Sequence, residues 1–303
     1  EIISCGGAFN SPQLLQLSGV GNAKDLEALG IDVVHDLPGV GENMQDHLEV
    51  YIQYACKQAV SMQPALKWYL KPWIGYRWLF WRKGAAATNH FEAGGFIRSK
   101  KGVEHPDLQY HFFPMAVRYD GQSPNGGHGF QAHVGSMRSQ SKGWVRLRSN
   151  DYRDKPKMLF NYMSKDEDWE EFRAAIRLTR EIFEQEAFKP FAGEELSPGK
   201  HIETDEDLNA YLKDAVESAY HPSCTCKMGS DEMSVVDAAC KVRGIEGLRV
   251  VDSSIMPSIV SGNLNAPTVM IAEKAADIIK GVDALHPSDA AVYVADDYID
   301  SQR

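Results

Sequence analysis

The sequence predicts a mixed α/β and α+β fold built from two parts. Both ends of the chain, residues 1–48 and 221–283, alternate short apolar strands with helices and glycine-rich loops, as parallel α/β domains do. The middle, residues 49–220, holds strands in which apolar and polar residues alternate, followed by amphipathic helices, which indicates an antiparallel sheet. Residues 284–303 are acidic and lose this pattern, so we expect them to be poorly ordered.

The first part opens on an apolar strand that runs into Gly6-Gly7. Ser11 is a favourable N-cap and Pro12 is favoured at the first helical position, so we expect a helix to begin there and to end at Gly19. The other elements predicted for this region are a helix at 22–29 capped by Asn22, a strand at 31–34 and a loop at 38–41.

The middle and the end of the chain also carry clear patterns. Strands with period-two alternation are predicted at 108–112, 131–134 and 144–148. Helices with one apolar face are predicted at 165–187 and from a Thr204 cap through Ala215. A strand at 248–251 and a helix at 267–280 that ends at Gly281 complete the second α/β segment. The sheet and its helices therefore form a second domain between two segments of the first.

Composition excludes several classes of protein. The 303 residues are 43% hydrophobic and 24% charged, which is ordinary for a globular chain. The net charge of -10 argues against a general nucleic-acid binder, which needs an excess of Lys and Arg. No apolar run approaches the roughly 20 residues that a membrane-spanning helix needs. The five cysteines are an odd number at irregular spacing, which favours a reducing compartment over a disulfide framework.

Residues 50–91 differ from the rest of the chain because they contain no Asp or Glu while carrying six Lys and Arg. Seven aromatic residues lie within 68–81: Trp68, Tyr69, Trp73, Tyr76, Trp78, Phe80 and Trp81. Three interpretations fit this segment: a helix packed into the core, a membrane-surface patch with Trp anchors among basic residues, or an aromatic cage for a cationic ligand.

Two segments carry polar residues suited to chemistry. His221 lies directly before Pro222, which disfavours a helical backbone and places the imidazole in an extended or turn segment after the preceding helix. The loop at 261–268, Ser-Gly-Asn-Leu-Asn-Ala-Pro-Thr, opens directly onto a helix, so its backbone N–H groups suit an anionic ligand or a developing negative charge. Each segment also has a simpler interpretation, a structural histidine and an ordinary helix cap.

Zinc binding and serine hydrolysis are not expected. Cys224 and Cys226 are separated by one residue instead of the two typical of zinc sites, and no second pair matches them, so we expect no metal. The chain contains no Gly-x-Ser-x-Gly nucleophile elbow.

Four ordered motifs resemble those of the glucose-methanol-choline (GMC) oxidoreductases, flavoenzymes that oxidise alcohols. They are Gly7-Ala-Phe-Asn-Ser-Pro-Gln-Leu-Leu-Gln-Leu-Ser-Gly-Val-Gly21, Pro38-Gly-Val-Gly-Glu-Asn-Met-Gln-Asp-His47, Tyr220-His221-Pro222, and Val251-Asp252-Ser253 through Gly262-Asn-Leu-Asn-Ala-Pro-Thr268. The resemblance covers nearly all of residues 1–283. It implies the C-terminal portion of a GMC fold, with part of a Rossmann-like FAD-binding domain at 1–48 and 221–283 and a substrate-binding domain at 49–220.

The resemblance also implies roles for particular residues. His221 corresponds to the active-site base of the family, and Asn265 corresponds to its partner. Asp252, Ser253, Asn263, Asn265 and Thr268 correspond to positions that line FAD. The chemistry is consistent, because a histidine that titrates near neutrality can take a hydroxyl proton while hydride passes to the flavin N5.

The implied substrate is a small alcohol. Segments such as Asn89-His-Phe-Glu-Ala-Gly-Gly-Phe96 and Gly143-Trp-Val-Arg-Leu-Arg-Ser149 resemble the choline-oxidising members, so the implied reaction converts choline to betaine aldehyde, a step in glycine betaine synthesis. A quaternary ammonium needs aromatic faces and a carboxylate. Glu92 and His111 are the substrate contacts that the resemblance suggests. Another primary alcohol remains an alternative.

One element of the family has no match in this chain. No strand, Gly-x-Gly-x-x-Gly and helix combination is present to receive the FAD pyrophosphate. We therefore expect the chain to be a C-terminal fragment that alone binds FAD weakly or not at all and does not oxidise choline. A second hypothesis is that the fragment acts only as a binding module, with the aromatic basic segment as its contact surface.

The resemblance favours a cytoplasmic protein that attaches to the inner face of the cell membrane, with contact through residues 68–83. The electron acceptor is not identified, and the membrane respiratory chain is one candidate. No nucleic-acid partner is expected.

Overall fold

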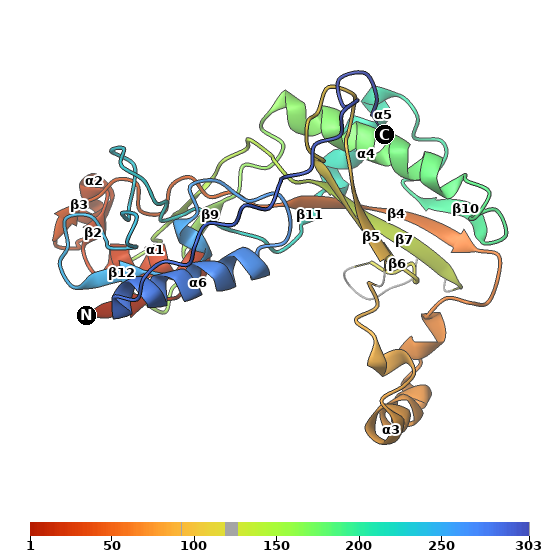
Figure 1. Cartoon of the computed structure of the whole chain (residues 1–303), viewed down its shortest axis with the longest axis horizontal. Helices are drawn as coiled ribbons and strands as arrows, with labels where there is room; N and C mark the ends of the chain where they lie inside the picture. The colour runs from red at the N-terminus through yellow and green to blue at the C-terminus, as the bar shows by residue number, and fades with distance from the viewer. Residues whose placement is uncertain (92, 119–126, 303) are drawn as a thin grey trace. The chain divides into compact units, whose positions relative to one another are not determined.

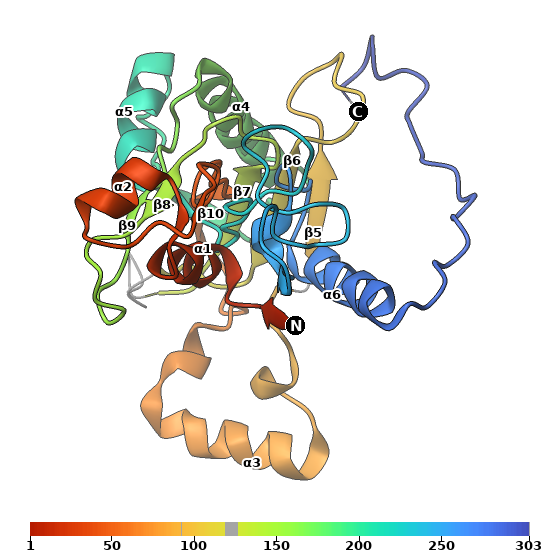
Figure 2. The same cartoon turned by 90° about the vertical axis from the view of Figure 1, so that its left-hand side faces the viewer.

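The α/β segments from the two ends of the sequence come together in one structural unit (Figures 1 and 2). The computed structural model describes residues 1–91, 93–118 and 127–302. Unit 1 contains residues 1–47, 137–168 and 218–293, and unit 2 contains residues 48–136, 169–217 and the end of the chain from Val294. Residues 137–168 therefore lie in unit 1, although the sequence pattern groups them with the central sheet.

Unit 1 is built on a parallel strand pair. The strands β1 (Ile2–Ser4) and β12 (Leu248–Val250) pair in register, which confirms both predicted strands. Two helices follow these strands, α1 (Gly7–Leu17) and α6 (Asn265–Lys280). The smaller elements are β2 (Val20–Gly21), α2 (Ala23–Ala28), β3 (His35–Asp36), β8 (Trp144–Arg146), β9 (Lys157–Leu159) and the 3-10 turn η4 (Ser253–Ile255). Asn22 caps α2 as predicted.

The helix α1 begins four residues before the predicted N-cap Ser11. The Ser11 hydroxyl instead donates a hydrogen bond to the Asp252 carboxylate at 2.6 Å and accepts one from the Gly6 N–H at 3.0 Å. Pro12 thus lies inside the helix, where it cannot donate to the carbonyl of Ala8. The Thr225 hydroxyl donates to that carbonyl at 2.7 Å, so a side chain replaces the missing backbone bond.

Two further predictions for unit 1 were wrong in position. Residues 31–34 form no strand; β3 follows them, and Val34 and His35 donate backbone hydrogen bonds to Gly19. The strand at 144–148 is not part of the central sheet, because β8 pairs with β9 and Val145 donates to the Gly41 carbonyl at 2.7 Å.

Unit 2 is an antiparallel sheet with helices. Its strand order is β10-β4-β7-β6-β5, and β11 also pairs with β4. The bounds are β4 Leu48–Cys56, β5 Ala93–Ile97, β6 Leu108–Phe113, β7 Gly129–Ser136, β10 Ala192–Ser197 and β11 Glu217–Ser218. The predicted strands at 108–112 and 131–134 are confirmed as β6 and β7. The strand β4, which lies next to β7 and β10, was not predicted.

Helices pack against this sheet through aromatic side chains. The helix α4 (Asp166–Phe183) places Phe183 against Tyr54 of β4 and Phe130 of β7, with ring centroids 5.1 and 5.0 Å apart. The helix α5 (Asp205–Ala215) begins with the predicted Thr204 cap, which forms a reciprocal capping box with Asp207. Both helices were therefore predicted correctly.

The aromatic segment forms an arm that stands away from this sheet (Figures 1 and 2). It consists of the 3-10 turns η1 (Gln63–Leu66), η2 (Trp68–Leu70) and η3 (Ala85–Ala87) around the helix α3 (Lys71–Trp81). None of the α3 side chains is buried, and Trp68 is 79% exposed. The prediction that this segment packs into the core was wrong, because its main contacts are with η1, η2 and η3.

The end of the chain makes specific contacts within unit 2. Residues 282–295 contain no regular helix or strand. The Gln302 side chain donates hydrogen bonds to the carbonyls of Arg98 and Ser99 at 2.7 and 3.0 Å, and the Arg98 side chain donates to the Gln302 carbonyl at 2.9 Å. These contacts belong to the segment for which we predicted poor order.

Candidate active site

A cavity of about 480 Å³ in unit 1 brings together most of the predicted site residues. Its walls come from the turn between β1 and α1, the segment around His221, and the loop that leads into α6. His221, Ser253, Asn263, Asn265 and Thr268 all line it. A cavity of this size lies within the range of roughly 300–1,000 Å³ that is typical of small-molecule sites.

Asp252 supports the wall of this cavity from behind. Its carboxylate accepts hydrogen bonds from the Gly7 N–H at 2.9 Å, the Ser11 hydroxyl at 2.6 Å and the Ser254 N–H at 2.8 Å. Gly7 adopts a φ of +76°, which favours glycine, and this turn carries the chain from β1 into α1. In the structure Asp252 therefore holds two cavity segments together and is not itself a lining residue.

A buried carboxylate holds the segment that carries His221. Asp46 accepts hydrogen bonds from the hydroxyls of Tyr162 and Ser218, both at 2.6 Å, and from the His221 N–H at 2.9 Å. Burial raises the pKa of Asp46, and the hydrogen bonds from Ser218 and Tyr162 oppose that shift. Because all three donors converge on Asp46, the backbone of His221 has a defined position.

The imidazole of His221 contacts a second histidine that we did not predict as a site residue. The Nδ1 atoms of His47 and His221 lie 3.1 Å apart, and the two rings are nearly perpendicular. His47 is 4% exposed, and its Nε2 lies 3.2 Å from the carbonyl of Met137. The sequence signal was available, since His47 ends the Gln-Asp-His motif, but nothing in the sequence connects it to His221.

Burial and the charge of His221 lower the pKa of His47 to about 4. Its ordinary value is 6.5, so protonation of this histidine favours the unfolded chain. The stability that depends on a neutral His47 is complete above about pH 6.5 and decreases by about 3 kcal/mol as the pH falls to about 4.

We therefore expect His47→Gln, which cannot take up a proton here, to lose less stability than the wild type between about pH 7 and about pH 4.5. Urea unfolding of both proteins at the two pH values measures the difference. Parallel losses in the two proteins would contradict the assignment.

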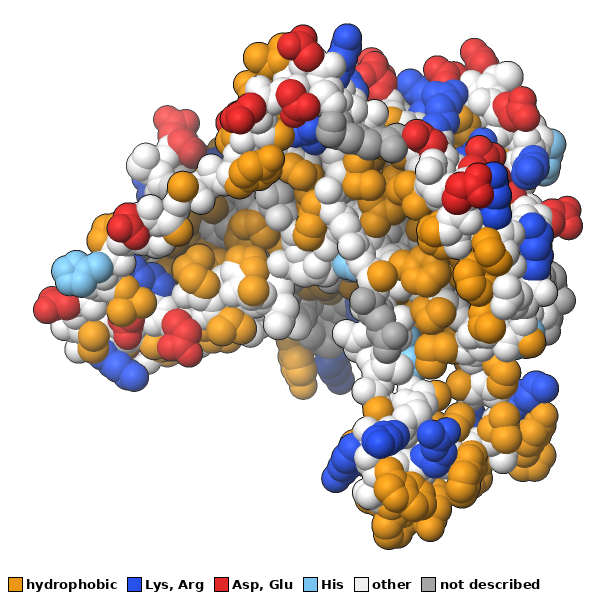
Figure 3. All heavy atoms as spheres, turned by 45° about the vertical axis from the view of Figure 1, so that its right-hand side comes forward, with side chains coloured by type: hydrophobic (Ala, Val, Ile, Leu, Met, Phe, Trp, Pro, Cys, Tyr) orange, Lys and Arg blue, Asp and Glu red, His pale blue; other side chains and the backbone are white. Residues whose placement is uncertain are grey.

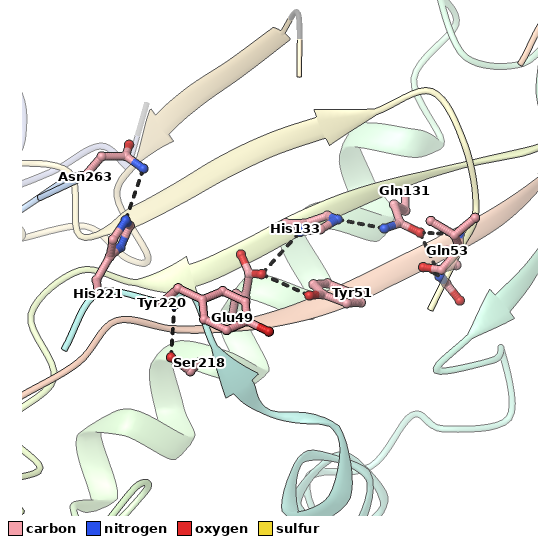
Figure 4. A network of polar contacts seen from close by, with 10 residues as sticks. Glu49, Tyr51, Gln53, Gln131, His133, Ser218, Tyr220, His221 and Asn263 are labelled. Atoms are coloured by element: carbon pink, nitrogen blue, oxygen red, sulfur yellow. Dashed lines mark hydrogen bonds and ion pairs between the residues drawn. The ribbon is translucent and has the colours of Figure 1, made fainter. Parts of the chain in front are cut away.

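The other ring nitrogen of His221 accepts a hydrogen bond from Asn263. The Asn263 Nδ2 lies 3.4 Å from His221 Nε2 (Figure 4). Gly262, with a φ of +127°, turns the chain before Asn263, whereas Asn265 is the first residue of α6. Asn265 lines the same cavity, and its catalytic and cofactor-binding roles stay predictions, as do those of His221, Ser253, Asn263 and Thr268.

A second polar cluster lies on the sheet of unit 2 and centres on Glu49, which is buried (Figure 4). Its Oε1 accepts a hydrogen bond from the Tyr51 hydroxyl at 3.1 Å and lies 3.3 Å from His133 Nδ1. A buried carboxylate on a strand is costly unless it is paired or binds a cation. We did not predict Glu49; the signal was the alternation of Glu49, Tyr51 and Gln53 with apolar residues along β4.

The hydrogen bonds around Glu49 define the state of His133. The Val117 N–H donates to Gln131 Oε1 at 2.9 Å, so the other end of this amide, Nε2, donates to His133 Nε2 at 2.7 Å. His133 therefore carries its proton on Nδ1 and donates it to Glu49. The Oε1 atom of Glu49 thus accepts two hydrogen bonds, one from Tyr51 and one from His133.

Aromatic rings and a second carboxylate adjoin this cluster. The ring of His133 lies 4.0 Å from Tyr51 and 5.2 Å from Phe91, and Phe91 stacks on Phe113 at 4.9 Å. Burial and then the charge of Glu49 raise the pKa of Glu217. The buried Glu217 Oε2 has no hydrogen-bond partner among the described residues. Carboxylates beside aromatic faces suit a cationic ligand.

The two predicted substrate contacts have different outcomes. Glu92 lies outside the described residues. His111 lies on β6, opposite His133 of β7 in the antiparallel register, and its ring centroid is 6.1 Å from that of Phe91. His111 is thus a neighbour of the cluster in unit 2, and its contact with substrate stays a prediction.

Comparison with protein families decides the classification. Two models, both described as GMC oxidoreductase, match residues 1–49 and 139–272. The chain belongs to the GMC oxidoreductase family. The N-terminal match ends at Glu49, and the C-terminal match includes His221, Asn263 and Asn265, so the family models cover the cavity of unit 1.

This GMC chain is similar to curated proteins named oxygen-dependent choline dehydrogenase. It is 59% identical to the protein from Acinetobacter baumannii (strain AYE) over 97% of this chain and 53% of that protein. It is also 59% identical to the protein from Pseudomonas fluorescens (strain SBW25) over 98% of this chain and 52% of that protein. The chain spans about half the length of these relatives, and corresponds to their C-terminal portion.

Solved structures of GMC-type enzymes share the fold. Pyridoxine 4-oxidase from Mesorbium loti is 26% identical with a TM-score of 0.80, and the match covers 94% of this chain and 52% of that one. A formate oxidase variant from Aspergillus oryzae RIB40, studied for modification of its FAD, is 26% identical with a TM-score of 0.87, covering 93% of this chain and 54% of that one. The predicted fold class, an FAD-type α/β part with an antiparallel-sheet domain, is thereby confirmed.

Proposed function

We propose that this chain is the C-terminal part of an FAD-dependent choline dehydrogenase that oxidises choline to betaine aldehyde. The similarity to choline dehydrogenases supports the reaction class. The observation that carries the proposal is the cavity of unit 1, in which the imidazole of a backbone-anchored histidine is held between His47 and Asn263.

The residues of this cavity fit the ring end of FAD. The helix α6 begins at Asn265, and its N-cap, Leu264, supplies no side-chain cap within the described chain. The first N–H groups of α6 and the positive end of its dipole therefore suit a negatively charged ring. The glycine turn at Gly6-Gly7 supplies a wall without side chains. When bound, FAD supplies the acceptor for the hydride that leaves the carbinol carbon.

The residues of this chain would handle the proton. His221 Nε2 accepts the proton of the substrate hydroxyl as the C–H bond breaks, so the alcohol loses a proton and a hydride and becomes an aldehyde. The Asn263 amide lies 3.4 Å from His221 Nε2, so it orients the imidazole edge that faces the substrate hydroxyl. Asp46 holds the backbone of His221 in place. A positioned general base of this kind contributes about 10²–10⁴-fold to the rate.

Choline is favoured over an uncharged alcohol by the cluster in unit 2. Glu49 accepts hydrogen bonds from Tyr51 and His133, its charge contributes to the raised pKa of Glu217, and the rings of Tyr51 and Phe91 adjoin His133. A trimethylammonium group binds carboxylates and aromatic faces by charge alone, since it has no hydrogen to donate. Another primary alcohol, the alternative substrate, would leave these carboxylates without a role.

The full-length enzyme tests this proposal directly. We expect choline, added without oxygen, to bleach the visible flavin band completely, and we expect its uncharged carbon isostere to do so only at much higher concentration. Equal dependence on the two alcohols would contradict choline as the substrate. The absence of a flavin spectrum in the full-length protein would contradict the proposal as a whole.

We further propose that the arm formed by residues 68–83 attaches the protein peripherally to an anionic membrane surface. Its aromatic side chains are exposed together, and they alternate with Lys71, Arg77, Arg82 and Lys83 (Figure 3). Trp and Tyr rings favour the headgroup region, and Lys and Arg favour anionic lipids. Among the described residues, no helix is long and apolar enough to cross a bilayer, so the contact would be peripheral.

Replacing Lys71, Arg77 and Lys83 by Gln should weaken the binding of the full-length protein to vesicles containing anionic phospholipid. Because each basic residue near such a surface contributes about 1 kcal/mol, the three together correspond to about 100-fold. Co-sedimentation measures the change, with Lys24, Lys101 and Lys155, which are exposed elsewhere, replaced by Gln as the control. Equal binding of both triple variants would contradict the role of the arm.

A further inference from the structure

We propose that His47 is a positioning residue that holds His221 in the tautomer with its proton on Nδ1, so that Nε2 is the basic atom. This inference rests on the proposed role of His221 as the base. The residue that determines which nitrogen of His221 is basic would then lie outside the cavity lining, which includes His221 but not His47.

The proton on His47 is positioned by the groups around its ring. The carbonyls of Met137 and Val260 favour protonation of this ring, but burial and the charge of His221 outweigh them. His47 is therefore neutral near pH 7 and carries one proton. Its Nε2 lies 3.2 Å from the Met137 carbonyl, which can only accept a hydrogen bond. We therefore place the proton of His47 on Nε2, where the Met137 carbonyl accepts it.

The protonation of His47 constrains the position of the proton on His221. With its proton on Nε2, His47 presents a lone pair at Nδ1, which lies 3.1 Å from His221 Nδ1. Two lone pairs at this separation would repel each other, so His221 Nδ1 must carry a proton and donate it. The ring planes are 88° apart, and the backbone of His47 is itself held, since its carbonyl accepts a hydrogen bond from the Ala219 N–H at 2.8 Å.

An independent contact at the other side of the ring agrees. His221 Nε2 lies 3.4 Å from the amide nitrogen of Asn263, which can only donate. His221 Nε2 must therefore accept, and it has the lone pair that a general base requires. The carbonyl of Met137 and the amide of Asn263 thus lead, from opposite ends of the network, to the same tautomer.

The wild-type protein provides the first test. Nitrogen NMR of the full-length enzyme labelled at histidine should show His221 with a protonated Nδ1 and an unprotonated Nε2 near neutral pH, assigned by its loss in His221→Ala. A protonated Nε2 on neutral His221 would overturn the inference without any assay of activity.

Two isosteric variants provide the second test. In His47→Asn the side-chain oxygen can occupy the place of Nδ1 and still accept from His221, whereas in His47→Gln the amide can still donate to Met137 but presents no acceptor to His221. We expect His47→Gln to lower kcat by about 10- to 100-fold with a smaller change in KM, and His47→Asn to stay within about threefold of wild type. The NMR signals should show mixed tautomers only in His47→Gln.

The outcomes separate this inference from the proposed function. If His221→Ala keeps its activity, the proposed base is wrong. If His221→Ala is inactive while the two His47 variants have equal kcat and the same His221 tautomer, the base stands and the role of His47 is refuted. A loss of activity in both His47 variants with an unchanged tautomer would also refute it, because it would show a purely structural contribution.

Discussion

Replacing His221 by Ala in the full-length enzyme is expected to lower kcat/KM for choline by about 10²–10⁴-fold, the usual contribution of a general base. The loss should appear mainly in kcat, because the imidazole accepts a proton in the transition state and contributes little to binding of the ground state. Steady-state reduction of an artificial electron acceptor, together with the anaerobic rate of flavin bleaching, measures the effect on the chemical step.

The structure indicates why this variant should still fold. The backbone N–H of His221, not its side chain, donates to Asp46, and Ala keeps that bond. His105, half-buried and paired with Glu104 in unit 2, is the matched control, and His105→Ala should leave the rate unchanged. Turnover of His221→Ala within about tenfold of wild type would exclude a general base at this position and favour the binding-module hypothesis.

The rate of His221→Ala also has an expected pH dependence. If no other residue replaces His221 as the base, the rate of the variant should rise with hydroxide concentration. The wild-type rate should instead reach a plateau once the base is unprotonated. A plateau at the same pH in the variant would show that another group acts as the base.

The cavity of unit 1 was predictable from the sequence because its residues come from short, continuous motifs. The turn at Gly6-Gly7, the His221-Pro222 pair and the loop before α6 each have a local backbone requirement that only certain residues meet. The hydrogen bond from Asn263 to His221 shows the limit of this reasoning. Which of two nearby amides reaches His221 depends on the turn at Gly262 and the first turn of α6, which spacing alone does not define.

His47 and Glu49 were missed for a related reason. Both lie in one short stretch of sequence, but their roles depend on partners far along the chain: Met137 and His221 for the first, and His133 for the second. A single sequence does not show such pairings. The alternation of polar and apolar residues along β4 is consistent with Glu49 on a strand face. The most conspicuous feature of the adjoining residues 50–91, however, is that they contain no acidic side chain.

The helix α3 illustrates the opposite error. Seven aromatic residues in a short segment favour burial by composition, since aromatic rings contribute large apolar areas to cores. The aromatic side chains of α3 pack instead on one another, with Tyr76 in contact with Trp73, Phe80 and Trp81. In the described chain this helix contacts little beyond its own flanking turns, so its rings stay exposed.

Replacing Glu49 by Gln should distinguish a charged substrate from an uncharged one. Both hydrogen bonds to Glu49, from Tyr51 and His133, end on Oε1, and a glutamine keeps that oxygen. The substitution therefore removes the charge while preserving the contacts that orient the side chain. Since a buried interaction with a charged group is worth about 1.5–3 kcal/mol, we expect kcat/KM for choline to fall by about 10- to 100-fold, mainly through KM.

The uncharged isostere of choline is the internal control for Glu49→Gln, because it fills the same space without a charge. Its kcat/KM should change by less than about threefold, so the ratio of the two substrates measures the electrostatic contribution of Glu49 apart from any effect on folding. Glu194→Gln on β10, which alters a more exposed carboxylate of the same sheet, should leave the ratio unchanged. Equal losses for choline and its isostere in Glu49→Gln would assign Glu49 a structural role and remove the main support for choline over other primary alcohols.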